Sequence, residues 1–152
     1  MFKLQNTFQS LLKEGFKTYS GVEESILRNI EAAKEISSMT RTSLGPNGMN
    51  KFIVNHLDKL YLTKDSGVMC RELEVNHPAV NLIVKSSKIQ ETECGDNTNY
   101  VITFAGELLT AAEILIKAGV HPTDIISGYE KGLLKTFELL DSAKTVEIEN
   151  IR

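Results

Sequence analysis

The most apolar part of the chain, residues 100–116, sets the strongest limit on what this sequence can fold into. Its apolar side chains lie on nearly every side of a helix that we expect from about residue 97 to Lys117, closed by Gly119. A helix that is apolar all round is typical of a protein interior, so we predict that it is fully buried. Glu107 and Glu113 interrupt the segment, no 18-residue stretch is free of charge, and we expect no membrane span.

Four further helices are predicted on either side of this segment. Ser20 and Glu23 form a capping-box pattern, and apolar residues recur at helical spacing from Ile26 to Ile36. This helix is expected to stop near Leu44, because the glycine and proline of residues 45–48 cannot continue it. The other three cover about residues 66–73, residues 78–93 and a segment from Pro122 with the apolar face Ile126, Tyr129, Leu133, Phe137 and Leu140.

A β-hairpin is expected between the first two of these helices. The apolar or β-branched runs 52–54 and 60–63 flank the polar residues 55–59, which predicts two strands joined by a five-residue loop. Two strands alone are marginally stable in water, so the hairpin is expected to need strands from elsewhere. The predicted fold class is mostly α with one β-hairpin.

Composition adds limits on the class of protein. The 152 residues are 41% hydrophobic, enough to form a core, and the net charge of −3 argues against a general nucleic-acid interface. Cys70 and Cys94 form neither a metal-type pair nor a disulfide framework, which favours free thiols and a reducing compartment. The first residues lack the apolar run of a signal peptide, so we expect a cytoplasmic protein. His77 and His121 each precede a proline at a helix start, which predicts capping rather than metal binding.

Three loops could contact phosphate: residues 42–51, 63–67 and 94–99. The first is rich in glycine but is not a P-loop. In the second and third, Asp65 and Asp96 stand where helices begin. Each aspartate alone is typical of an N-cap. The alternative is that the helix start binds an anion while the carboxylate holds Mg²⁺ or positions a water molecule.

Taken jointly, the loops and several longer stretches resemble the group II chaperonins, the family of the eukaryotic cytosolic chaperonin. The resemblance runs from about residue 12 to residue 152 and no single short motif carries it. The stretches are LKEG at 12–15, SGVEE at 20–24, GPNGMNK at 45–51, VNHL at 54–57, RELEV at 71–75, HPA at 77–79 and FAG at 104–106.

The resemblance implies a fold and an assembly. Residues 1–143 would be the N-terminal half of an equatorial ATP-binding domain, and residues 144–152 the start of an intermediate domain. The apical domain and the C-terminal equatorial half would lie outside this sequence, and the helix at 97–117 would pack against that half, which leaves a large apolar face exposed here. The family also implies a cytoplasmic, ATP-dependent double ring of paralogous subunits that binds unfolded client proteins. In it, the hairpin pairs with terminal strands of a neighbouring subunit.

Site roles are carried over by the same resemblance. Asp65 would be the catalytic carboxylate that helps orient the attacking water, and Asp96 the Mg²⁺ ligand. The nucleotide-binding residues would be Leu44, Gly45, Pro46, Gly95, Asp96, Asn97, Thr98 and Asn99.

Four positions depart from the usual family pattern. Lys64 replaces an asparagine, Ser66 replaces glycine or alanine, Val68 replaces a threonine and Asn97 replaces a glycine. Val68 and Asn97 favour an alternative in which the chain fills a place in the ring without hydrolysing ATP. A third hypothesis, a free-standing helical enzyme of another class, has no nucleophile–base pair or metal cluster in the sequence to support it.

Overall fold

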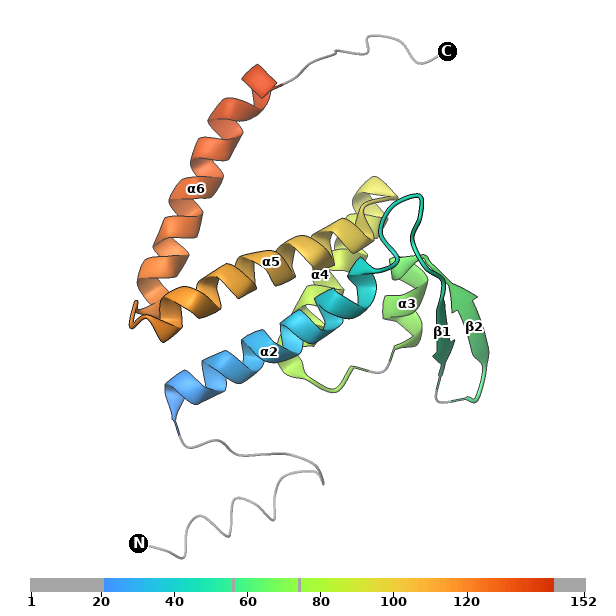
Figure 1. Ribbon diagram of the computed structural model, residues 1–152. Coiled ribbons are helices and arrows are strands. Elements are labelled where there is room, and N and C mark those ends of the chain that lie inside the picture. Colours follow the sequence, from blue (N-terminus) through green and yellow to red (C-terminus); the bar gives the residue numbers. More distant parts are fainter. Residues whose placement is uncertain (1–20, 56, 74, 144–152) are drawn as a thin grey trace, which may run out of the picture. The chain divides into compact units, whose positions relative to one another are not determined.

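The computed structural model describes residues 21–55, 57–73 and 75–143. The chain divides into two compact units, Met1–Thr110 and Ala111–Arg152, and each is described by itself. In the described residues the elements are α2 (Val22–Arg41), β1 (Lys51–Val54), β2 (Leu60–Thr63), α3 (Ser66–Glu72), α4 (Pro78–Cys94), α5 (Thr98–Lys117) and α6 (Pro122–Ala143) (Figure 1). The predicted class, mostly α with one hairpin, is confirmed.

The ends of α2 differ from the prediction. Gly21 occupies the N-cap position and makes no side-chain cap bond, whereas Ser20 lies outside the described residues. At the other end the helix stops at Arg41, three residues before Leu44. The chain turns early because the Ser43 N–H and hydroxyl both donate to the Thr40 carbonyl, at 3.0 and 2.6 Å.

The hairpin is confirmed, with β1 and β2 antiparallel and Phe52 opposite Leu62. Asn55 closes its loop, because the Asn55 side-chain oxygen accepts from the backbone N–H groups of Leu57 and Lys59. The amide nitrogen of Asn55 donates to Glu72 at 2.9 Å, which ties the hairpin to the last residue of α3. Desolvation and the same Glu72 carboxylate raise the pKa of Tyr61 on β2.

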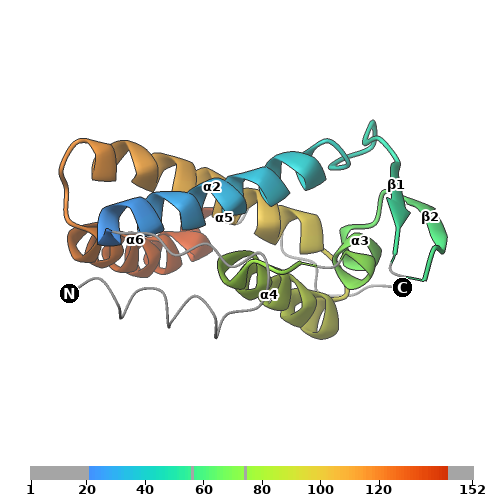
Figure 2. The same ribbon diagram turned by 90° about the horizontal axis from the view of Figure 1, so that it is seen from below.

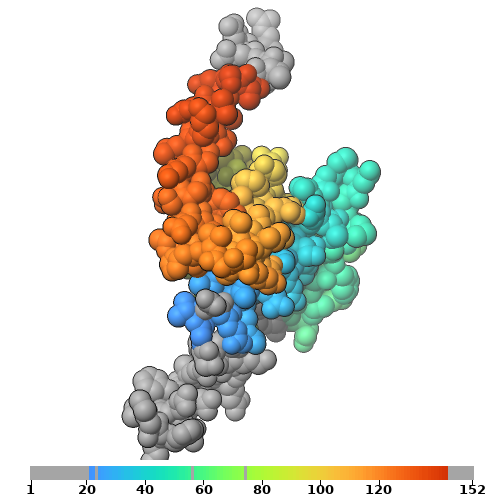
Figure 3. Space-filling view, turned by 60° about the vertical axis from the view of Figure 1, so that its left-hand side comes forward, coloured from blue at the N-terminus to red at the C-terminus, as the bar shows by residue number. Residues whose placement is uncertain are grey.

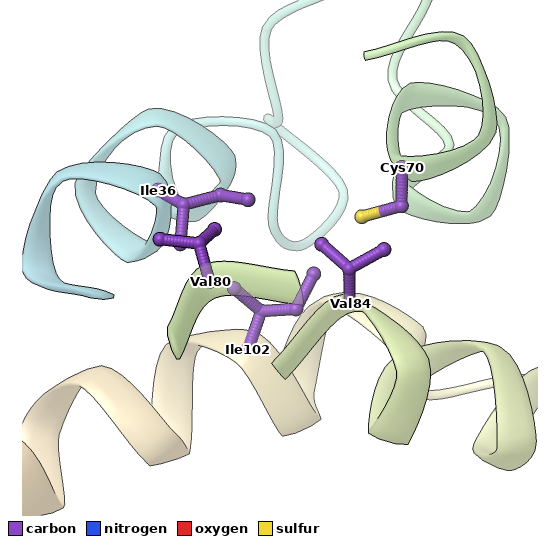
Figure 4. Close-up of a cluster of buried hydrophobic side chains, with 5 residues drawn as sticks. All are labelled: Ile36, Cys70, Val80, Val84 and Ile102. Carbon is purple, nitrogen blue, oxygen red and sulfur yellow. The ribbon is translucent and has the colours of Figure 1, made fainter. Parts of the chain in front are cut away.

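The core of the first unit lies where four helices meet (Figure 4). One buried side chain comes from α2, one from α3, two from α4 and one from α5. The side chain from α3 is that of Cys70, and burial raises the pKa of its thiol. Both cysteines are free, as predicted. The cluster consists of Ile36, Cys70, Val80, Val84 and Ile102.

Helix α4 begins at Pro78 as predicted and ends at Cys94, followed by Gly95 in the left-handed conformation, with φ 73°. His77 takes the N-cap position of this helix, as predicted, but its ring makes no cap bond. Pro78 at the first helical position has no N–H, so one of the unbonded amide groups of the first turn is absent.

Within the first unit, α2 runs beside residues 98–110 of α5 in both ribbon views (Figure 1 and Figure 2). Gly106 permits the close approach, since a Cβ there would lie 2.2 Å from the Ser37 hydroxyl oxygen. Ser37 donates to the Thr103 carbonyl, and Arg41 forms an ion pair with Glu107. The register between the two helices therefore places the start of α5 beside the end of α2.

The prediction that α5 is fully buried is wrong. Ile102 is fully buried, but Phe104 is 50% exposed and Ile114 is 67% exposed. Tyr100 and Leu115 are also exposed, at 55% and 42%, whereas Ala112 is buried, so part of the apolar surface of α5 is uncovered, as the family resemblance implied. Among the described residues α5 alone is long and apolar enough to cross a membrane, a test that core helices of water-soluble domains also pass. The absence of a membrane span stays a prediction.

The second unit contains the end of α5 and α6. Gly119 follows α5 with φ 91°, as the predicted helix stop requires. The His121 ring accepts from the Thr123 N–H at 3.3 Å, so the predicted capping role is confirmed for this histidine. The predicted apolar face of α6 is largely exposed, with Phe137 at 63%. Figure 3 shows the chain in a space-filling view, with α6 in orange to red.

Candidate functional site

The three glycine- and aspartate-containing loops converge on one cleft of about 280 Å³ in the first unit. Seven of the nucleotide-binding and catalytic residues predicted from sequence line this cleft: Leu44, Gly45, Asp65, Asp96, Asn97, Thr98 and Asn99. Pro46 and Gly95 were also predicted, but they are not among the lining residues. Sequence spacing alone could not establish this convergence, because the loops are about 20 and 30 residues apart in the chain.

The first loop is held in a tight turn. Gly45 has φ 84°, which glycine adopts without steric cost. The Gly48 N–H donates to the Gly45 carbonyl, and the Met49 N–H donates back to Thr42. A Cβ on Gly48 would lie 2.2 Å from the Ser43 carbonyl oxygen, so the turn requires glycine at this position. Around Gly45 itself a Cβ would meet nothing within 4 Å, which leaves its backbone open toward a ligand.

The second loop presents Asp65. Its Oδ1 accepts from the Gly67 N–H at 2.9 Å, so Asp65 is the N-cap of α3. The Asp65 N–H in turn donates to the Thr63 hydroxyl at 3.0 Å. These bonds fix the carboxyl group and leave Oδ2 without a hydrogen bond from the described residues. The N-cap role and a role in the cleft are therefore compatible, since each uses a different oxygen.

The third loop has two residues in the left-handed region, Gly95 with φ 73° and Asn97 with φ 67°. Asn tolerates this conformation better than most residues, which explains how it can replace glycine here. Asp96 lies between them, and its Oδ1 accepts from the Asn97 N–H at 2.6 Å. The exposed Asp96 carboxylate thus projects from a fixed turn at the mouth of the cleft.

Asn99 joins the first loop to the third. Its side-chain nitrogen donates to the Thr40 carbonyl at 3.0 Å and to the Ser43 hydroxyl at 3.1 Å. Its side-chain oxygen accepts from Thr103 at 3.2 Å. Both side-chain amide hydrogens are used inside the protein, so in this structure the Asn99 side chain positions the first loop and has no donor left for a ligand.

Replacement of Asn99 by Asp is expected to loosen the first loop. A carboxylate oxygen would then face the Thr40 carbonyl instead of a donor, and the loss of the two bonds to Thr40 and Ser43 would cost about 1–3 kcal/mol locally. Hydrogen exchange of the full-length protein should show faster exchange at residues 43–49. Thr92→Val, which removes an exposed hydroxyl bonded within α4, serves as the control and should leave exchange unchanged. Unaltered protection of residues 43–49 in N99D would contradict the positioning role.

Four cleft residues were not predicted as site residues: Ser43, Lys64, Ser66 and Tyr100. Lys64 and Ser66 flank Asp65 directly, so their proximity to a predicted catalytic carboxylate was a usable signal. Tyr100 lies one residue beyond the third loop, and its ring stacks on Phe104 with centroids 5.8 Å apart. No sequence pattern indicated that this exposed ring would reach the cleft.

The donor set suits a phosphate group and a divalent cation. The Lys64 ammonium and open backbone at Gly45 favour an anion, whereas Asp65 and Asp96 favour a cation. Among the described residues no three His, Cys, Asp or Glu side chains form a metal-binding group. Mg²⁺ is commonly bound by one or two carboxylates together with substrate phosphates, so the residues present fit Mg²⁺ bound with a nucleotide.

Comparisons with known proteins show the family of the chain. The model of the TCP-1/cpn60 chaperonin family matches residues 36–152. T-complex protein 1 subunit theta of Arabidopsis thaliana is 51% identical over 147 residues, 93% of this chain and 27% of that protein. The theta subunits of Gallus gallus and Homo sapiens are 49% and 48% identical over 145 residues, 95% of this chain and 26% of each protein. This sequence thus spans about a quarter of the length of these relatives. The resemblance to chaperonins is confirmed, and the chain belongs to the TCP-1/cpn60 chaperonin family.

Proposed function

We propose that this chain forms the nucleotide-binding part of an ATP-dependent chaperonin subunit. The convergence of three loops on one cleft, with a carboxylate at each of two of them, carries the proposal. By family membership, the subunit would stand with paralogous subunits in a cytoplasmic double ring and assist the folding of client proteins. Residues 1–143 would belong to the equatorial domain and residues 144–152, which lie outside the described residues, to the start of the intermediate domain.

The cleft residues divide the work of holding a nucleotide. Leu44 and Gly45 would lie against the nucleotide where the first loop opens, with Pro46 behind them. Thr98 and Asn97 would face the phosphates from the start of α5. Asp96 would hold Mg²⁺, which when bound supplies positive charge that offsets the charge of the phosphate oxygens.

Asp65 would serve hydrolysis through the oxygen that the N-cap leaves free. Its Oδ1 is occupied by the Gly67 N–H, so Oδ2 would accept a hydrogen bond from a water molecule and orient it. Phosphoryl transfer depends mainly on positioning and charge stabilisation, which a fixed carboxylate can provide. The rigid N-cap geometry supports this role because it removes rotational freedom from the carboxyl group.

A second candidate function is a ring subunit that does not hydrolyse ATP. Two observations favour it. Val68, in the first turn of α3, carries no hydroxyl, and Asn97 places a side chain on a left-handed turn that borders the cleft. Both would leave binding possible and would weaken the geometry of hydrolysis.

Hydrogen exchange of the full-length protein tests nucleotide binding directly. Addition of ADP with Mg²⁺ is expected to slow exchange in residues 43–45, 64–67 and 96–99, because these segments surround the cleft. Residues 122–143 of α6, outside the first unit, serve as the internal control and should not change. Protection that falls elsewhere, or no protection at saturating ADP, would contradict the proposal.

A further inference from the structure

One residue that lines the cleft has a buried polar atom without a hydrogen-bond partner in the described part of the chain. Ser66 is the first residue of α3, it lines the cleft, and it is only 2% exposed. Its hydroxyl oxygen is buried and makes no hydrogen bond to any of the described residues. Buried hydroxyl groups are nearly always hydrogen-bonded, so an unpartnered one at a cleft points to a group that binds there.

The surroundings of Ser66 indicate which kind of group this is. Lys64, two residues earlier, also lines the cleft and brings a positive charge. Val68, one half-turn later, has no hydroxyl, so Ser66 supplies the hydroxyl donor within the first turn of α3. A hydroxyl donor beside an ammonium group matches a phosphate oxygen, which accepts hydrogen bonds and carries negative charge.

We propose that the Ser66 hydroxyl donates a hydrogen bond to a phosphate oxygen of the nucleotide bound in the cleft, and so is a binding residue of this site. The inference rests on the proposed nucleotide-binding function and adds a contact that the sequence comparison did not assign. It also explains why a serine occupies this buried position, since glycine or alanine would have no hydroxyl to leave without a partner.

The stability of the free protein gives the inference a second consequence. In the absence of nucleotide the buried hydroxyl has lost water and gained no partner, so it opposes folding. Ser66→Ala removes that atom and nothing else. The nucleotide-free variant should therefore keep or increase the hydrogen-exchange protection of α3, while its affinity for nucleotide falls. A residue that only stabilises the fold would show the opposite pattern.

The experiment compares the full-length wild-type protein with Ser66→Ala and Ser86→Ala. Ser86 is an exposed α4 serine whose hydroxyl bonds to Leu82 within its own helix, so its replacement is the matched control. Calorimetry with ADP and Mg²⁺ should give an affinity about tenfold lower for S66A, as expected for the loss of a hydrogen bond to a charged acceptor, and an unchanged affinity for S86A. Hydrogen exchange of α3 in nucleotide-free S66A should be the same as in the wild type or slower.

Each outcome bears on the proposal. An unchanged ADP affinity in S66A overturns it, and so does a lower affinity accompanied by faster exchange of α3, which would make Ser66 a structural residue. Wild-type protein that fails to bind ADP would instead refute the proposed nucleotide-binding function. The two failures are therefore distinguishable.

Discussion

Replacement of Asp65 by Asn is expected to lower ATP turnover at this subunit's site at least about 100-fold, the usual effect of removing a group that handles the reacting water. An asparagine oxygen can still accept the Gly67 N–H bond, so α3 keeps its N-cap. The negative charge that would orient the water is lost. D65N thus separates the catalytic role of the residue from its structural role.

The measurement requires a ring in which this subunit alone is competent for turnover. Asp65→Ala provides the comparison, because it removes both the charge and the cap and should also cost about 1 kcal/mol of local stability. D65N should keep the hydrogen-exchange protection of α3, and D65A should lose part of it. Full turnover in D65N would exclude the catalytic role. An absence of turnover in the wild-type subunit would instead support the second candidate function, a ring subunit that does not hydrolyse ATP.

Replacement of Asp96 by Asn is expected to weaken binding of ADP about 10- to 100-fold in the presence of Mg²⁺, which corresponds to the loss of a charge-assisted contact. Asparagine can still accept the Asn97 N–H, so the left-handed turn is retained. Without Mg²⁺ the two proteins should bind ADP nearly equally, because the carboxylate would then have no cation to hold.

Calorimetry with ADP in Mg²⁺ and in EDTA checks this expectation on the full-length protein. Asp58→Asn, on the hairpin loop and outside the cleft, is a matched control for removal of one negative charge. A loss of affinity in D96N that is the same with and without Mg²⁺ would contradict the metal-binding role. Equal losses in D58N and D96N would show that the effect is one of overall charge.

The local structure was largely predictable from sequence. Proline at position 78, glycine at 119 and the polar loop between the strands act through the backbone of their own segment, so their effects can be inferred without the rest of the fold. The caps were less predictable. Ser20 and His77 both match capping patterns, yet Gly21 takes the first N-cap position and the His77 ring makes no cap bond.

Burial and tertiary contacts were the least predictable features. The apolar pattern of residues 97–117 predicted a fully buried helix. This prediction failed because the pattern indicates which helix surface is apolar, but not whether other residues of the described chain cover that surface. The role of Asn99 could not be derived from its loop either, since its partners Thr40 and Ser43 lie more than 50 residues away. Asp65 and Asp96 could be predicted as candidate site residues because a carboxylate at the start of a helix has few roles, and the sequence around it is enough to suggest them.

Helix α3 has a mechanical consequence for the hairpin. Its N-cap, Asp65, borders the cleft, and its last residue, Glu72, holds Asn55 of the hairpin loop. Seven residues of α-helix span about 10 Å. Helix α3 therefore connects the cleft directly to the hairpin, and a shift of Asp65 along the helix axis would also change the position of Glu72 and of the Asn55 side chain bonded to it.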